Sequence, residues 1–120
     1  MLLSKDYDAL WNLLKDTNSA PVYMEKMDEE ESKIPPKFVI FQRSTNDNGS
    51  ESGDGVEILR DKYFTISIYA KKINDAVTIM DAYRNKLIQN GIRFTQQGPL
   101  YDTTSQRYTI DLDGRYSYGV

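Results

Sequence analysis

The sequence predicts an α+β domain in which two helices pack on one face of a mainly antiparallel sheet. The chain has 120 residues, of which 39% are hydrophobic, enough for one core without disulfides. Two segments alternate apolar and polar residues with period 2, and two others have apolar residues at helical spacing. Short turns join most of the expected strands, which favours antiparallel pairing. The predicted order is helix, three strands, helix, two strands, in a single domain over 1–120.

The first helix is expected over residues 4–16. Its apolar stripe recurs at steps of three and four residues, as on one face of a helix: Leu3, Tyr7, Leu10, Trp11 and Leu14. Ser4 is a suitable N-cap, since its hydroxyl can accept a hydrogen bond from a free amide of the first turn. Charged residues within this segment exclude a signal peptide. No run reaches the ~20 apolar residues of a membrane span, so we expect an intracellular, soluble protein.

Three strands are expected next, over 21–25, 37–43 and 62–70. Pro35 and Pro36 lack the amide that a central strand donates, so the second strand begins after them. The third has the clearest alternation in the chain: Phe64, Ile66, Ile68 and Ala70 share one face, and Tyr63, Thr65, Ser67 and Tyr69 share the other. The first face suits a core, and the second suits water or a protein interface.

The second helix is predicted over 74–91, with Asn74 as N-cap and Gly91 in the left-handed position after its end. Its apolar stripe is Ile73, Ala76, Val77, Met80, Leu87 and Ile88, with Tyr83 and Arg84 between. A strand over 92–96, a turn over 98–105 and a strand over 105–116 follow. In the last strand Tyr108, Ile110 and Leu112 share one face, and Arg107, Thr109, Asp111 and Asp113 share the other.

A long mobile loop is predicted between the second and third strands, because residues 44–55 contain no apolar side chain. Residues 45–57 contain four acids and no base: Asp47, Glu51, Asp54 and Glu57. A second acidic run, residues 25–31, has five acids and one base. The net charge is −3, so the rest of the chain is mildly basic. Such runs are usually solvated, but they also allow charge-complementary association.

The composition excludes several kinds of chemistry. Without cysteine or histidine there is no disulfide, no thiolate zinc site and no serine–histidine–aspartate triad. The glycines of the insert open no helix, so they form no phosphate loop. Asp111 and Asp113 could act as an acid–base pair. A solvated strand face beside Arg107 and Arg115 is the plainer interpretation. We expect no catalytic residue, metal or cofactor.

Tyrosine is frequent, with nine residues, and several are predicted to be exposed. Tyrosine is enriched at protein–protein interfaces, because its ring gives apolar contact area and its hydroxyl tolerates water. The net acidic charge argues against specific nucleic-acid recognition. The candidates for an assembly interface are Asp47, Glu51, Asp54, Glu57, Tyr63, Tyr69, Arg107, Asp111 and Asp113.

The layout resembles the tail terminator, or tail completion, proteins of long-tailed bacteriophages and prophages. The resemblance runs over about residues 1–116 and rests on PPKFVIFQR, the polar insert, VEILRDKYFTISIYAKKINDAVTIMDAYRNKL and YDTTSQRYTIDLDGRY. It implies a non-enzymatic protein that caps the head-proximal end of the tail tube as a hexameric ring. The implied partners are further copies of the chain, the major tail tube protein and the head–tail connector.

The same resemblance implies that DNA passes through the ring without specific binding, and that the protein lies at the head–tail interface of the virion after assembly in the host cytoplasm. Two alternatives stay open. One is a small non-enzymatic α+β adaptor or binding domain. The other is a related head-side joining, or connector, protein. A carboxylate-dependent enzyme is a third class, and the sequence favours it least.

Overall fold

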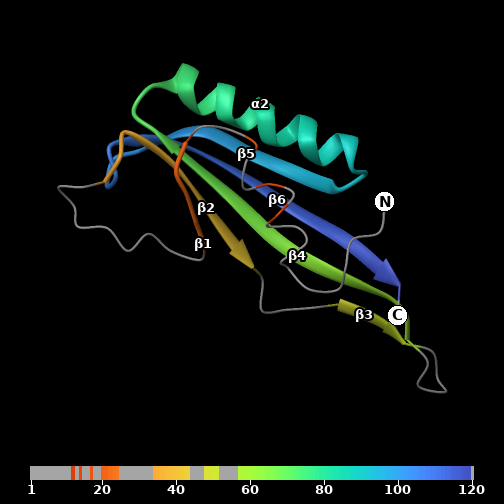
Figure 1. The fold of residues 1–120 in the computed structure, drawn as a ribbon. Coiled ribbons are helices and arrows are strands. Elements are labelled where there is room, and N and C mark those ends of the chain that lie inside the picture. Colours follow the sequence, from red (N-terminus) through yellow and green to blue (C-terminus); the bar gives the residue numbers. More distant parts are fainter. Residues whose placement is uncertain are drawn as a thin grey trace.

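The computed structural model describes Asn12, Leu14, Thr17 and residues 20–24, 34–43, 48–51 and 57–119; for 48–51, 57–62 and 116–119 it describes the backbone alone. Its centre is one six-stranded sheet, in which five strands lie in the order β1-β2-β4-β6-β5 and β3 pairs with β4 (Figure 1). The strands are β1 (Val22–Met24), β2 (Lys37–Arg43), β3 (Asn48–Glu51), β4 (Glu57–Ala70), β5 (Arg93–Asp102) and β6 (Arg107–Gly119). Only the β1–β2 pair is parallel among these strands. The prediction of an α+β fold with a mainly antiparallel sheet is therefore confirmed. The predicted order of elements is wrong, because four strands and not three precede α2.

The helix α2 (Ile73–Gln89) connects β4 to β5. Both strands are antiparallel to β6, so they run parallel to each other with β6 between them. This arrangement is a split β-α-β unit. Because α2 crosses from one strand to a parallel one, it lies along one face of the sheet and packs against β4, β5 and β6 (Figure 1).

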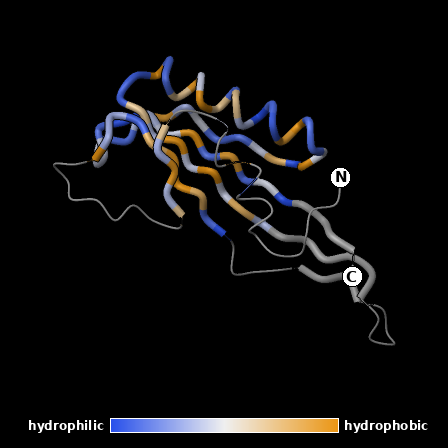
Figure 2. The backbone as a smooth tube through the Cα atoms, in the orientation of Figure 1, coloured by the Kyte–Doolittle hydropathy of each residue, from blue (hydrophilic) through white to orange (hydrophobic). Residues whose placement is uncertain are grey.

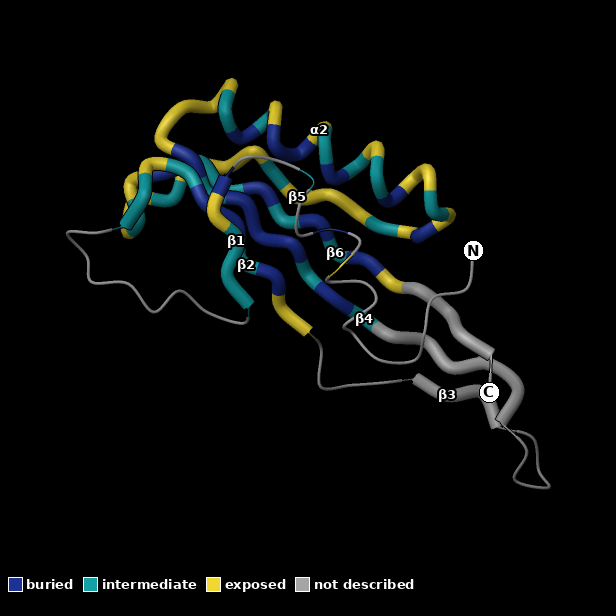
Figure 3. Tube along the Cα trace, in the orientation of Figure 1, coloured by how far each residue is buried: buried dark blue, intermediate teal, exposed yellow. Residues whose placement is uncertain are grey.

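The core lies between α2 and this face of the sheet. The alternation predicted for 62–70 is confirmed, since Ile66 and Ile68 are buried and pair with the buried Leu112 and Ile110 of β6. Val39 and Phe41 of β2 continue the same layer. Apolar residues run along the middle of these strands (Figure 2), and burial is greatest there (Figure 3).

The buried stripe of α2 is displaced from the predicted one. Ala76, Ile79, Met80, Tyr83 and Leu87 are buried, whereas Ile73 and Ile88 are 43% and 60% exposed. The prediction included the last two because they fit the helical spacing, yet Ile73 is the first residue of the helix, and Ile88 lies beside the stripe that faces the sheet.

The ends of α2 differ in how well the sequence predicted them. The N-cap is Lys72, without a side-chain hydrogen bond, so the prediction of Asn74 as the cap is wrong. Asn74 lies inside the first turn, where its carbonyl accepts a hydrogen bond from the Thr78 hydroxyl. Gly91 has φ 68°, which confirms its predicted left-handed conformation after the helix.

The turn predicted over 98–105 begins later than expected. β5 continues to Asp102, and a bulge at Gly98 and Pro99 shifts its register between Gln97 and Leu100. Glycine fits this bulge because its φ is 98° and a Cβ there would lie 2.5 Å from the Thr109 carbonyl oxygen. Gly-Pro thus marks an irregularity within an edge strand, and the chain reverses only after Asp102.

The polar insert is not a loop throughout, contrary to the prediction. Asn48–Glu51 form β3, which pairs antiparallel with the first residues of β4. The reason lies in the length of β4, which begins at Glu57, well before the alternating apolar segment. The backbone N–H and C=O groups of this extension need hydrogen-bond partners. The backbone of a polar segment can supply these partners as well as the backbone of an apolar one.

The helix predicted over 4–16 falls almost entirely outside the described residues. Asn12 and Leu14 are described, and both have helical backbone. Leu14 is buried in the same core cluster as Ala76 and Met80 of α2. Within the described residues, α2 is the one helix whose bounds are established.

Candidate assembly surface

The second face of the sheet, opposite α2, has a mixed chemistry. The strand register places Thr65, Ser67 and Tyr69 of β4 between the residues of two neighbouring strands. We call this surface the polar face and define it by Tyr23, Phe38, Ile40, Tyr63, Thr65, Ser67, Tyr69, Arg107, Thr109, Asp111, Asp113 and Arg115. Among the described residues, no helix lies on it.

Three aromatic rings from neighbouring strands meet on the polar face. The Phe38 and Tyr69 rings stack with centroids 4.7 Å apart, at an interplanar angle of 15°. Tyr23 meets Phe38 edge to face at 6.3 Å. Such pairs stabilise beyond the area they bury, by about 0.5–1.5 kcal/mol each. The cluster thus joins β1, β2 and β4 on this face through side-chain contacts.

Arg107 is buried, whereas the sequence predicted a solvated side chain on a strand face. Only 8% of it is exposed. Its guanidinium donates hydrogen bonds to the Ser105 carbonyl at 2.7 Å and the Pro35 carbonyl at 3.1 Å, and lies 5.5 Å from the centre of the Phe38 ring. Two carbonyls and an aromatic face compensate the loss of water, so this cation joins the start of β6 to the segment before β2.

Two aspartates of β6 lie on the polar face, as predicted, and both are partly buried. Asp113 accepts a hydrogen bond of 2.7 Å from the Thr65 hydroxyl. Asp111 pairs with the buried Ser67. Burial, first of all, and then the charges of Asp111 and Asp102 raise the pKa of the Tyr69 hydroxyl. Tyr69 is therefore a neutral hydrogen-bonding group at physiological pH, between an aromatic cluster and an acidic one.

Asp102 ends β5 and closes the turn into β6. Its carboxylate accepts hydrogen bonds from the Thr104 amide at 3.2 Å and the Ser105 amide at 3.4 Å. Hydrogen bonding from Ser105, first of all, and from the Thr104 amide lowers the pKa of Asp102. The turn thus positions Ser105, whose carbonyl binds Arg107.

The β5 side of the molecule has the exposed apolar residues. β5 is the last strand in the sheet order, and most of its residues are exposed. The exposed large hydrophobic residues found among the described residues all belong to α2 or β5: Ile73, Ile88, Leu100 and Tyr101. Leu100 and Tyr101 are 65% and 52% exposed. An edge strand with unpaired backbone groups and exposed apolar side chains is a surface that other chains can pair with.

The predicted interface residues fall into two groups. The strand register brings Tyr63, Tyr69, Asp111 and Asp113 onto the polar face, and the alternation of β6 adds Arg107. The acidic candidates lie elsewhere. Glu51 belongs to β3 and Glu57 to β4, on the far extension of the sheet, whereas Asp47 and Asp54 lie outside the described residues.

Sequence reasoning missed Phe38 and Tyr23 as members of this surface. The alternation of β2 could have predicted the position of Phe38. Val39 and Phe41 face the core, so Phe38 and Ile40 must face the other way.

Within the described part of the chain, no three carboxylates gather closely enough to bind a metal ion. No helix in that part is long and apolar enough to cross a membrane. No protein-family model matches the chain, and no curated protein is significantly similar to it in sequence.

Proposed function

We propose that this chain is a structural protein of a long-tailed phage or prophage that caps the head-proximal end of the tail tube as a ring. Several copies, six in the resembled family, form the ring and stop further growth of the tube. The ring then joins the tail to the connector of the head, and DNA passes through its centre without specific binding. The protein in this proposal acts by assembly and is not an enzyme.

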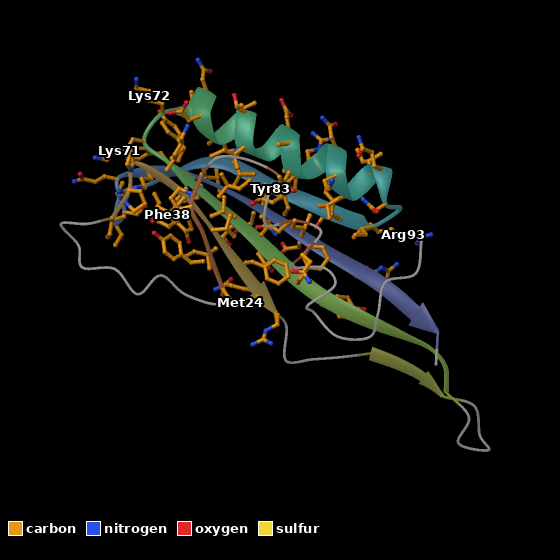
Figure 4. All side chains as sticks on the ribbon, in the orientation of Figure 1. Met24, Phe38, Lys71, Lys72, Tyr83 and Arg93 are labelled. Atoms are coloured by element: carbon orange, nitrogen blue, oxygen red, sulfur yellow. The ribbon has the colours of Figure 1, made fainter. Side chains whose placement is uncertain are left out.

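The observation that supports an assembly role best is the polar face. It combines the stacked rings of Phe38 and Tyr69, the neutral Tyr69 hydroxyl and the carboxylates of Asp111 and Asp113 on adjacent strands. Phe38 of this pair is labelled in Figure 4. Aromatic rings beside hydrogen-bonding groups are typical of protein interfaces. The exposed β5 edge supplies a second, chemically different surface, and a closed ring of identical copies needs two different surfaces in contact.

The proposal includes the helix expected over residues 4–16. Residues 4–16 would pack beside α2, since Leu14 has helical backbone and is buried in the core that α2 covers. Both helices would then lie on one face and leave the polar face for contacts with other chains. The partners there would be the tail tube protein on one side of the ring and the head connector on the other. The protein would thus lie in the virion, at the junction of head and tail.

The test uses the purified chain and tail tubes from the phage whose genome encodes it. We expect electron microscopy to show rings at one end of each tube, and tubes of defined length in place of long polymers. Tyr69→Glu should abolish capping, because it adds a negative charge beside Asp111 on the polar face. Asn85→Glu, on the exposed side of α2, is the matched control and should cap normally.

Two results would favour the alternatives. Binding to the head connector without any binding to tubes indicates a head-side joining protein. Binding to neither, together with a monomeric state at every concentration, indicates a small adaptor domain and contradicts the proposal.

A further inference from the structure

Two arginines lie directly opposite each other on the side of the sheet that bears the polar face. Arg93 is the first residue of β5 and pairs with Arg115 of β6. Phe94 packs against the core, so Arg93 must face the other way, as Arg115 does. Like charges at directly opposed positions destabilise a strand pair. Both arginines are exposed, and within the described part of the chain neither makes an ion pair.

Two carboxylates occupy the neighbouring positions of β6 on the same face. Asp113 pairs with Thr65 and Asp111 pairs with Ser67. The Asp113 carboxylate accepts the Thr65 hydrogen bond through one oxygen, Oδ1. Asp111 is partly buried, yet it makes no hydrogen bond or ion pair through its carboxylate to any residue that the structure describes. Such a carboxylate is suited to a cationic donor, since charge-assisted hydrogen bonds are the strong ones.

A buried hydroxyl beside Asp111 also lacks a partner. Ser67 is only 6% exposed, and the alternation of β4 places it on the polar face. Its hydroxyl oxygen is still accessible and makes no hydrogen bond to the described residues. Buried polar groups are normally hydrogen-bonded, so this hydroxyl and the Asp111 carboxylate indicate a donor that comes from another molecule.

The polar face therefore changes sign over a short distance along β6. Arg115, Asp113 and Asp111 follow one another at alternate residues, roughly 7 Å apart. A rotation of a second copy by 180°, about an axis that crosses the strands between Arg115 and Asp113, reverses this order. Each arginine then lies over a carboxylate of the other copy, and symmetry repeats the contact. The surface is thus complementary to itself.

We propose that the polar face packs against the same face of a second copy, with Arg93 and Arg115 of each copy bound to Asp111 and Asp113 of the other. Stacked sheets lie about 10 Å apart, a gap that long arginine side chains can cross. A guanidinium has five N–H donors, enough for the Asp111 carboxylate and the Ser67 hydroxyl together.

The dimer should be weak and reversible. Four strands, β2, β4, β6 and β5, at a spacing of about 4.8 Å and over about ten residues present roughly 600 Å². Each partner in a stable complex buries about 800 Å². The inference does not rest on the ring proposed above. It concerns the free chain, whose dimer has to open before the polar face can contact a tail tube.

The test exchanges charges between two variants. Arg93→Glu with Arg115→Glu makes this surface acidic, and Asp111→Lys with Asp113→Lys makes it basic. The second variant loses the hydrogen bond between Thr65 and Asp113. If it unfolds, Asp111→Lys alone replaces it, because Asp111 has no such bond to lose among the described residues.

Self-association is measured by sedimentation equilibrium of the purified chain, from micromolar to millimolar concentration. We expect the natural chain to dimerise at low salt and less at high salt. Each variant alone should dimerise at least about tenfold more weakly, since like charges then face each other. An equal mixture of the two variants should dimerise more tightly than the natural chain, because an acidic surface meets a basic one. One chain with all four substitutions should dimerise like the natural chain.

The matched control is Lys71→Glu with Lys72→Glu. It changes the net charge as much as the arginine variant does, at exposed positions far from Arg93 (Figure 4), and should dimerise normally. An equal loss in this control, no recovery in the mixture, or a natural chain without dimers would each overturn the inference. A monomeric chain that binds tail tubes through Arg93 and Arg115 would show that an acidic surface of the tube protein occupies this face instead.

Tube capping is scored separately on the natural chain. A dimer without capping refutes the proposed function alone, whereas capping by a chain that never dimerises refutes this contact alone.

Discussion

The two faces of the sheet are made by the same strands, yet they bury their residues for different reasons. On the α2 face, Ile66, Ile68, Ile110 and Leu112 are at most 1% exposed and apolar. On the polar face, Ser67 and Arg107 are also buried, and Arg107 is held there by hydrogen bonds to carbonyl groups and by the Phe38 ring. The hydrophobic effect stabilises the first face in proportion to the apolar area that it buries. The stability of the second face depends on hydrogen bonds and aromatic contacts that compensate the buried polar groups for the loss of water.

The two faces should therefore contribute to different properties, one to stability and the other to assembly. The apolar side chains of the α2 face are already buried against other parts of the same chain. The polar face leaves Tyr23, Tyr69 and Asp111 partly exposed beside that rigid core. Substitutions on the α2 face should therefore act on folding, and substitutions on the polar face should act on folding less and on association more.

The largest expected effect comes from adjacent residues of β6 that face opposite ways. Ile110→Ala should lower the free energy of unfolding by about 2–5 kcal/mol, because it leaves a cavity in a fully buried site. Thr109→Ala should cost less than about 1 kcal/mol, since it removes one hydrogen bond of 3.3 Å to the Leu100 carbonyl. Denaturant unfolding measures both. Equal losses would contradict the division between the two faces.

A second effect comes from the glycine of β6 beneath an aromatic ring. The Phe64 ring covers Gly114, and a Cβ there would overlap it. Gly114→Ala should therefore destabilise by about 1–3 kcal/mol through overpacking. Thermal unfolding checks this, and Phe64→Leu in the same chain should restore part of the loss. If the two substitutions are simply additive, the ring is not the cause.

A third comparison concerns two arginines of β6 that the sequence places on one face. Arg107→Gln should lower the free energy of unfolding by about 2 kcal/mol, since two partly buried hydrogen bonds lose their charged donor. Arg115→Gln is the matched control, and because Arg115 is exposed its effect should stay within about 0.5 kcal/mol. Chemical denaturation of both variants distinguishes them, and an equal effect would mean that the carbonyl contacts of Arg107 do not stabilise the fold.

The smallest effect is a pH dependence on the polar face. The folded pKa of Tyr69 lies above its ordinary value of 10.0, so the unfolded chain ionises first. The stability due to the neutral hydroxyl is present below pH 10.0 and is lost as the pH rises from there through the folded pKa. Tyr69→Phe should lack this loss. Unfolding of both chains across alkaline pH tests it, and parallel curves would show that Tyr69 does not contribute.

The periodic part of the sequence determined most of the fold. Period 2 in β4 and β6 identified both strands and the face of each residue, because only one alternation puts isoleucine and leucine on the same side. Proline and glycine predicted the start of β2 and the end of α2 for local conformational reasons. The absence of cysteine and histidine excluded several site chemistries from composition alone.

Tertiary structure decided what periodicity leaves open. Helical spacing could not show that Ile88 lies outside the contact with the sheet, and polarity could not show that Asn48–Glu51 pair with β4. The burial of Arg107 depends on Pro35 and Phe38, which are distant in the chain, as well as on the nearby Ser105. Local pattern fixes which way a residue faces along its own element, whereas its partners come from other segments, and only the folded chain brings those segments together.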